Sequence, residues 1–252
     1  MKNKKSIIAM LFSILVLPIA LLFTACGTTS QLDTKATCDT RGTYQTAATA
    51  NELNDAIGTQ DDFESDGLRL TSDVELDLGG TEKIKASFNA IYKNNELAVK
   101  MVLPDFASST TTKIKYTNSY AYYKDGYIYA TLNNAKIKYQ AEVDKMFDIS
   151  TYFQYIKQYS NVEQLLNLVK NSSNISVFKD GNNFKVDFAD SVVFSDASMY
   201  LNFNAENVLK ALNLQFNISA STMNIGAAVT MSPFDGEIEF PDLSSYTLTN
   251  NI

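Results

Sequence analysis

Most of the chain alternates hydrophobic and polar residues, which is the pattern of β-strands that bury one face and leave the other wet. The run at residues 68–78 is the clearest, with Ser72 as the one polar residue in its apolar phase. Asn94-Asn95, Asp125-Gly126 and Asp180-Gly181 separate such runs with residues that suit tight hairpin turns. The pattern predicts strands at residues 68–78, 84–92, 97–103, 114–123, 127–129, 137–143, 175–178, 184–188, 192–194, 199–203, 212–218 and 223–231.

Two segments change to the period of a helix. Residues from Thr46 to Ile57 predict a short helix that ends near Gly58, and residues 144–172 predict a pair of short amphipathic helices. Residues 204–211 fit either a turn or a helical turn. We therefore predict an α+β domain in which about ten strands, paired as hairpins, form an antiparallel sheet with helices on one face. A sheet of this size is expected to curl or close.

The first residues have the layout of an export signal. Three lysines precede an apolar run that ends at Phe23, and small residues then lead to Cys26. The segment resembles the signal of bacterial lipoproteins, although Phe23 stands where that family usually has leucine. The resemblance implies cleavage before Cys26 and attachment of a lipid anchor, with acyl chains such as palmitate, to its thiol. An uncleaved transmembrane helix is the alternative, because about 18 apolar residues approach the length of a membrane span.

Three regions follow from this interpretation: a signal peptide at residues 1–25, a flexible tether at residues 26–45 and a single domain at residues 46–252. The tether is rich in Thr, Ser, Ala and Gln and has no apolar period, which predicts a solvated, disordered segment. Two acyl chains are enough for stable anchoring. We expect the domain to lie on the extracytoplasmic face of the cell membrane, or on the outer membrane if the organism has one.

The domain is acidic. Removal of the signal, with its three lysines, would leave 18 basic and 28 acidic residues, a net charge of −10. Such a chain lacks the basic residues that neutralise phosphates, so we expect no nucleic-acid binding. Hydrophobic residues make up 45% of the sequence. A domain of about 200 residues with this composition has enough apolar surface for a globular core.

The sequence contains no histidine, which excludes Ser-His-Asp and Cys-His catalysis and histidine-ligated metals. Once Cys26 carries the lipid, Cys38 is the one remaining cysteine, so we expect neither a disulfide nor a thiolate metal site. Ser176 and Lys179 have the Ser-x-x-Lys spacing of penicillin-binding enzymes, but they fall on a predicted strand, whereas that chemistry needs a helix. We predict no catalytic residue and no enzyme activity.

An acidic segment at residues 61–67 has alternating carboxylates, as part of a calcium loop does. It lacks the glycine between the ligands and the final glutamate that an EF-hand requires. A solvated surface loop is the favoured interpretation, and weak calcium binding is the alternative. We therefore predict no metal site and no cofactor.

The order of the elements resembles the half-barrel of bacterial lipoproteins of the lipoprotein-carrier type and their actinobacterial lipid-binding relatives. A short helix precedes a long meander, a helical insertion follows, and the strands then resume; the tyrosine-rich hairpin at residues 122–129 also fits. The resemblance implies a strongly curved sheet wrapped over helices, with a lipid or another hydrophobic ligand in a concave cavity and no catalysis. The residues predicted to line this cavity are Phe88, Val99, Met101, Ile114, Tyr116, Phe153, Leu165, Leu214 and Phe216.

A surface interaction or adhesion module with a filled core is the alternative function. The hairpins of the chain are rich in tyrosine, and exposed tyrosines can stack on a glycan or contact a protein partner. The same tyrosines also suit cross-strand packing. A ligand cavity would favour the carrier, and a filled core would favour the interaction module.

Overall fold

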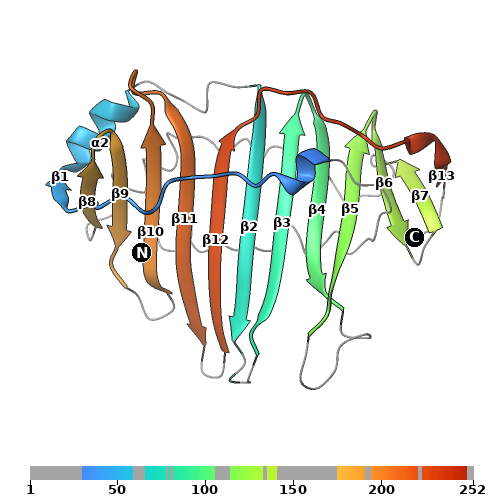
Figure 1. The fold of residues 1–252 in the computed structure, drawn as a ribbon, viewed down its shortest axis with the longest axis horizontal. Helices are drawn as coiled ribbons and strands as arrows, with labels where there is room; N and C mark the ends of the chain where they lie inside the picture. Colours follow the sequence, from blue (N-terminus) through green and yellow to red (C-terminus); the bar gives the residue numbers. More distant parts are fainter. Residues whose placement is uncertain are drawn as a thin grey trace.

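A computed structural model describes residues 30–58, 66–77, 79, 82–105, 114–132, 135–140, 175–190, 194–220 and 223–248. These residues form one large, curved and unclosed sheet of thirteen strands (Figure 1). The strand order is β1-β8-β9-β10-β11-β12-β2-β3-β4-β5-β6-β7-β13. All neighbouring strands are antiparallel except β7 and β13, which are parallel. The prediction of a curved antiparallel sheet is thus confirmed.

The strand bounds follow the alternating runs of the sequence. The strands are β1 Thr46–Ala48, β2 Gly67–Asp77, β3 Ile84–Lys93, β4 Glu96–Pro104, β5 Tyr116–Lys124, β6 Tyr127–Leu132, β7 Ala135–Gln140, β8 Ile175–Asp180, β9 Asn183–Phe188, β10 Phe194–Phe203, β11 Leu209–Ala220, β12 Met223–Pro233 and β13 Thr247–Leu248. One α-helix, α2 (Ala50–Ile57), and two 3-10 helices, η1 (Ser30–Asp33) and η2 (Leu243–Ser245), complete the described elements. No alternating run predicts the short edge strands β1 and β13.

Two hairpin turns have the backbone that their sequences predict. Asn94 and Asn95, between β3 and β4, have φ values of 50° and 61°. Asp125 and Gly126, between β5 and β6, have φ values of 51° and 79°. Positive φ at both central residues is the turn geometry that matches the twist of paired strands. These local signals therefore fix the register of both hairpins.

Two other local predictions need correction. The turn between β8 and β9 is centred on residues 181–182, because Asp180 already pairs with Asn183. Residues 204–208 form a turn, so the helical alternative for residues 204–211 is wrong. The side chain of Asn204 stabilises that turn by accepting hydrogen bonds from the backbone N–H groups of Glu206 at 3.0 Å and Val208 at 2.8 Å.

Helix α2 begins later than the apolar pattern indicates. The Thr49 hydroxyl accepts a hydrogen bond from the backbone N–H of Glu52 at 3.1 Å, and the Glu52 carboxylate accepts one from the N–H of Thr49 at 2.8 Å. This capping box sets the first helical residue at Ala50. Residues 46–48 are therefore extended and pair with β8 instead of joining the helix.

The two faces of the sheet differ in character. Alternate residues of a strand point to opposite sides, so the apolar phase of β2 and its paired neighbours defines one side, which we call the apolar face. Helix α2 packs on the apolar face, where Leu53 and Ile57 are fully buried among side chains of β8–β12 and β2. The helical pair predicted at residues 144–172 lies outside the described residues.

Residues 30–45, which we call the strap, cross the opposite face of the sheet, here named the strap face (Figure 1, blue). Arg69 of β2 donates hydrogen bonds from Nη1 to the backbone carbonyls of Gln31 and Thr34, each at 2.6 Å. Asn89 of β3 donates from Nδ2 to the carbonyls of Leu32 and Thr34, each at 2.7 Å. The expectation of a flexible tether is therefore wrong for the strap.

The physical reason for this correction is that polar side chains of the sheet bind the strap backbone. Arg69 and Asn89 occupy the polar phase of their strands and so read as solvent-facing residues, yet they are only 8% and 6% exposed. Leu32, whose side chain is 1% exposed, packs with Ile91 and Ala98 on the strap face. Composition alone indicates none of these contacts, because they join segments far apart in the sequence.

The segment after β12 covers another part of the strap face. Phe234, Ile238 and Tyr246 pack against the outer tyrosines of β5 and β6, and the rings of Tyr129 and Tyr246 meet edge to face at 5.6 Å. Gly67 permits this return of the chain, because a Cβ atom there would collide with the carbonyl oxygen of Phe234. The strap face is thus partly covered by both ends of the described chain.

We expect Arg69→Ala to lower the free energy of unfolding by about 2–3 kcal/mol, because two backbone carbonyls lose a charged hydrogen-bond donor. Equilibrium denaturation measures this change, and limited proteolysis within residues 30–45 measures release of the strap. Arg41→Ala is the matched control, since that side chain is 93% exposed. Equal effects of the two substitutions on stability and proteolysis would contradict the role of Arg69.

A second prediction concerns acid stability. Lys179 donates a hydrogen bond to Glu52 at 2.6 Å, and this bond, together with those from Thr49, lowers the pKa of Glu52 from its ordinary value of 4.5 to about 2. Glu52 therefore favours the folded state above pH 4.5, and this contribution is lost as the pH falls toward 2.

Glu52→Gln should accordingly reduce the fall in Tm between neutral pH and about pH 3. Thermal denaturation at the two pH values measures the difference. Glu239→Gln, at an exposed position, serves as the control. An unchanged fall in Tm for Glu52→Gln would show that this carboxylate does not contribute to acid sensitivity.

Candidate functional site

The structure places five of the predicted cavity residues on the apolar face, in two groups. Phe88 of β3 pairs with Met101 of β4, and Val99 lies two residues along the same strand; these three side chains form one buried cluster. Leu214 and Phe216 of β11 belong to the cluster that packs against α2. The strands β12 and β2 separate the two groups.

Ser72 lies between these groups, in the middle of the apolar face. It pairs with Phe88 on one side and with Val229 on the other. Its side chain is fully buried, and its Oγ has no hydrogen-bond partner among the described residues. Burial of an unpaired hydroxyl costs about 1–3 kcal/mol. Ser72 is thus a buried polar residue between two apolar neighbours on this face.

Tyr116 does not join the predicted cavity. Its pairing with Pro104 places it on the strap face, where its side chain is 38% exposed. Strand β5 carries tyrosines in both phases, so alternation alone does not identify the inward phase there. Ile114 precedes β5 and is half-buried. Phe153, Leu165 and the predicted lipidation site Cys26 lie outside the described residues.

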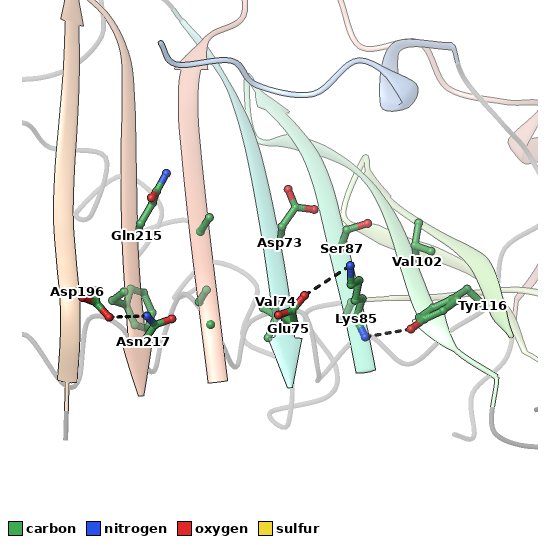
Figure 2. A pocket seen from close by; sticks show the side chains of 15 residues that line it. Asp73, Val74, Glu75, Lys85, Ser87, Val102, Tyr116, Asp196, Gln215 and Asn217 are labelled. Carbon is green, nitrogen blue, oxygen red and sulfur yellow. Dashed lines mark hydrogen bonds and ion pairs between the residues drawn. The ribbon is translucent and has the colours of Figure 1, made fainter. Parts of the chain in front are cut away.

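A groove of about 750 Å³ lies on the strap face, beyond the line of the strap (Figure 2). It crosses the strands from Asp196 in β10 to Tyr116 in β5. Gly226 and Ala228 of β12 form its floor with small side chains. The polar side chains that line it are Asp73, Glu75, Lys85, Ser87, Asp196, Gln215 and Asn217.

The charged groups at the centre of this groove form ion pairs. Lys35 of the strap donates to Asp73 at 2.8 Å. Glu75 lies 2.5 Å from Lys83 Nζ and 3.5 Å from Lys85 Nζ, and the hydrogen bond from Lys83 lowers the pKa of Glu75 below its ordinary value. The acidic and basic groups at the centre of the groove therefore offset one another.

Two further hydrogen bonds fix the ends of the groove. The Tyr116 hydroxyl accepts a hydrogen bond from the backbone N–H of Lys85 at 3.2 Å, which holds the ring over the neighbouring strands. At the other end, Asn217 Nδ2 donates to Asp196 at 3.0 Å. Asp196 sits at a bulge of β10 and has a φ of 51°, which turns its side chain toward Asn217.

Sequence reasoning missed this groove. Its polar residues occupy the phase of the alternating strands that normally faces solvent. No short stretch of sequence indicates that β12 pairs with β2. One signal was present: Gly226 and Ala228 occupy the polar phase of the last alternating run. A glycine within a strand often marks a position where another group approaches closely.

The candidate nucleophiles of the sequence are not arranged for catalysis. Ser176 and Lys179 are three residues apart on β8, so their side chains point to opposite faces of the sheet. Burial raises the pKa of the Cys38 thiol to about 12, so it is protonated at neutral pH. Within the described ranges, no group of three or more acidic or cysteine side chains is placed to hold a metal ion. The acidic residues 61–65 lie outside those ranges.

Three of the hairpin tyrosines do not form an open stacking surface. Tyr120, Tyr122 and Tyr129 are at most 8% exposed and pack beneath the segment that follows β12. Their rings therefore serve cross-strand and interlayer packing. These three tyrosines therefore offer no open surface to a protein or a glycan, whereas the side chain of Tyr116 is 38% exposed.

Comparisons with known proteins give a limited result. A search of solved structures finds a LolA superfamily protein from Nitrosomonas europaea, with 8% sequence identity, a TM-score of 0.28 and coverage of 76% of this chain and 96% of that chain. No family model and no curated protein matches the sequence. Similarity of this extent does not assign the chain to a family. Across the ranges that the structure describes, no helix has the length and apolar character that a membrane span requires.

Proposed function

We propose that this protein is a lipid-anchored, extracytoplasmic lipoprotein that binds a lipid or another hydrophobic ligand against the apolar face, without catalysis. The observation that carries the proposal is the extent of that face. Its apolar phase continues through β3 and β4, where Ala90, Leu97 and Leu103 are only partly buried around the cluster of Phe88, Val99 and Met101. Burial of apolar surface by a ligand is favourable by about 25 cal/mol per Å².

Ser72 gives the proposed site one polar feature. Hydrophobic binding sites commonly contain a few polar groups that fix the orientation of the ligand. The buried Ser72 hydroxyl has no hydrogen-bond partner in the described part of the protein, so its desolvation is not offset there. An ester, carboxyl or hydroxyl group of an otherwise apolar ligand would supply the missing partner.

The strap changes what lipidation at Cys26 would mean. The described strap begins at Ser30, so four residue steps would separate the lipidated cysteine from the sheet. Four extended steps span at most about 14 Å. The anchor would therefore hold the strap face close to the membrane, in contrast to a free tether of some twenty residues.

Ligand binding is tested by native mass spectrometry of the Cys26→Ser protein, with solvent extraction of whatever co-purifies. We expect a stoichiometric lipid in the Cys26→Ser protein and loss of most of it when Ala90→Phe is added, because the new ring projects from the apolar face beside Val99. Circular dichroism verifies folding, since overpacking costs about 1–3 kcal/mol.

Ala228→Phe is the matched control for this substitution, because it adds the same ring to the opposite face of the same sheet. Its lipid content should equal that of the wild type. A protein that is free of lipid after purification and takes up none from phosphatidylglycerol vesicles would sink the proposal.

The anchor has its own test, independent of the ligand. Metabolic labelling with palmitate should mark the full chain at Cys26 and place it in the membrane fraction, and Cys26→Ser should remove both label and membrane association. Cys38→Ser is the control and should change neither. Label that persists in Cys26→Ser would contradict lipidation at this residue.

A further inference from the structure

The groove on the strap face lies on the side of the sheet opposite the proposed hydrophobic site. It crosses six strand-to-strand spacings between Asp196 of β10 and Tyr116 of β5. Neighbouring strands lie about 4.8 Å apart, so the two strands that carry its end residues lie roughly 29 Å apart, and the side chains of Tyr116 and Asp196 lean inward over β3 and β11. A depression of this length suits an extended chain better than a compact small molecule.

The hollow has a specific structural cause. Gly226 and Ala228 project no long side chain from β12 onto the strap face. Longer side chains project from β11 and β2, the strands on either side (Figure 2). A Cβ atom at Gly226 would lie 3.2 Å from Oδ1 of Asn217, so the amide of Asn217 already leans over the glycine. The ion pair of Lys35 with Asp73 joins the strap to the sheet along one side of the depression.

The electrostatics of the groove favour a neutral ligand. At its centre, Asp73 and Glu75 are each paired with lysines; at one end, Asp196 accepts a hydrogen bond from the neutral amide of Asn217 and keeps its negative charge. A charged ligand would have to compete with these existing pairs. Amide and carboxylate oxygens nevertheless keep further lone pairs for hydrogen bonding.

The strands beneath the groove leave no room for a peptide to add to the sheet. From β10 to β5, every strand is paired on both sides, so no free sheet edge lies beneath the groove. Recognition of an extended peptide by strand addition requires a free edge. The groove instead offers side-chain groups: the amide of Gln215 and the hydroxyl of Ser87 both donate and accept, as sugar hydroxyls do.

We propose that this groove binds an extended, neutral carbohydrate chain. Gln215, Asn217 and Ser87 would hydrogen-bond its hydroxyl groups, and the exposed ring of Tyr116 would pack against the apolar face of a sugar. Because Gly226 and Ala228 are small, the carbohydrate chain can approach the surface of the sheet at β12. The site lies on the face opposite the proposed hydrophobic site, so neither proposal depends on the other.

The test is titration of the folded Cys26→Ser protein with maltopentaose, cellopentaose, xylopentaose and chitopentaose, monitored by NMR chemical-shift changes. We expect one of these neutral chains to shift the resonances of the groove residues. Ala228→Trp should fill the floor and weaken that binding by roughly tenfold or more. Gln215→Ala should weaken it through loss of hydrogen bonds to the sugar, without a change in Tm.

Ala90→Phe is the matched control, because it adds bulk to the other face, and it should leave carbohydrate affinity unchanged. Absence of any shift with all four oligosaccharides would overturn the proposal. So would equal affinity of the wild type and Ala228→Trp, or binding of an unstructured Ser-Gly peptide or of polygalacturonate at the groove in preference to the neutral chains.

Discussion

The pairing of β12 with β2 is the constraint on which the rest of the structure depends. Ten residue pairs, from Asn224 with Asp77 to Pro233 with Leu68, join the last long strand of the chain to the first. This contact unites the β2–β7 meander with the β8–β12 meander in one sheet. Because side chains alternate with period two, a slip of one residue would move each apolar side chain of β12 to the wet face.

The paired strands β12 and β2 contribute residues to both proposed sites, one on each face of the sheet. On the apolar face it places Val229 beside Ser72, and on the strap face it places Ala228 beside Asp73. The same register therefore creates an unpaired buried hydroxyl on one side and a shallow hollow on the other. Pairing of segments this far apart carries a loop-closure cost, so the continuous apolar face must supply much of the compensating stabilisation.

Arg69 links the parts of the chain that cross the wet side of the sheet. It holds the strap through two backbone carbonyls, and its guanidinium lies 5.3 Å from the centre of the Phe234 ring. One side chain thus contacts the segment that precedes the domain and the segment that follows β12. Burial lowers the pKa of Arg69, but a guanidinium stays charged at any physiological pH. These two segments thus cover part of the strap face, and the groove lies where neither of them covers the sheet.

The sequence by itself determined the local structure: strand positions, the turns at Asn94-Asn95 and Asp125-Gly126, and the helix ending before Gly58. These features depend on residues close together in the chain, so the hydrophobic periodicity and the turn residues of the sequence are enough to indicate them. The sequence also indicates that Phe88, Val99 and Met101 lie close together, because one hairpin contains them. Only the tertiary structure decided the strap, the position of Tyr116 and the groove, since each depends on long-range pairing or on polar side chains that bind distant backbone. A polar residue in an alternating strand looks the same whether its side chain stays exposed, as that of Asp73 does, or is buried and binds backbone carbonyls of a distant segment, as that of Arg69 is.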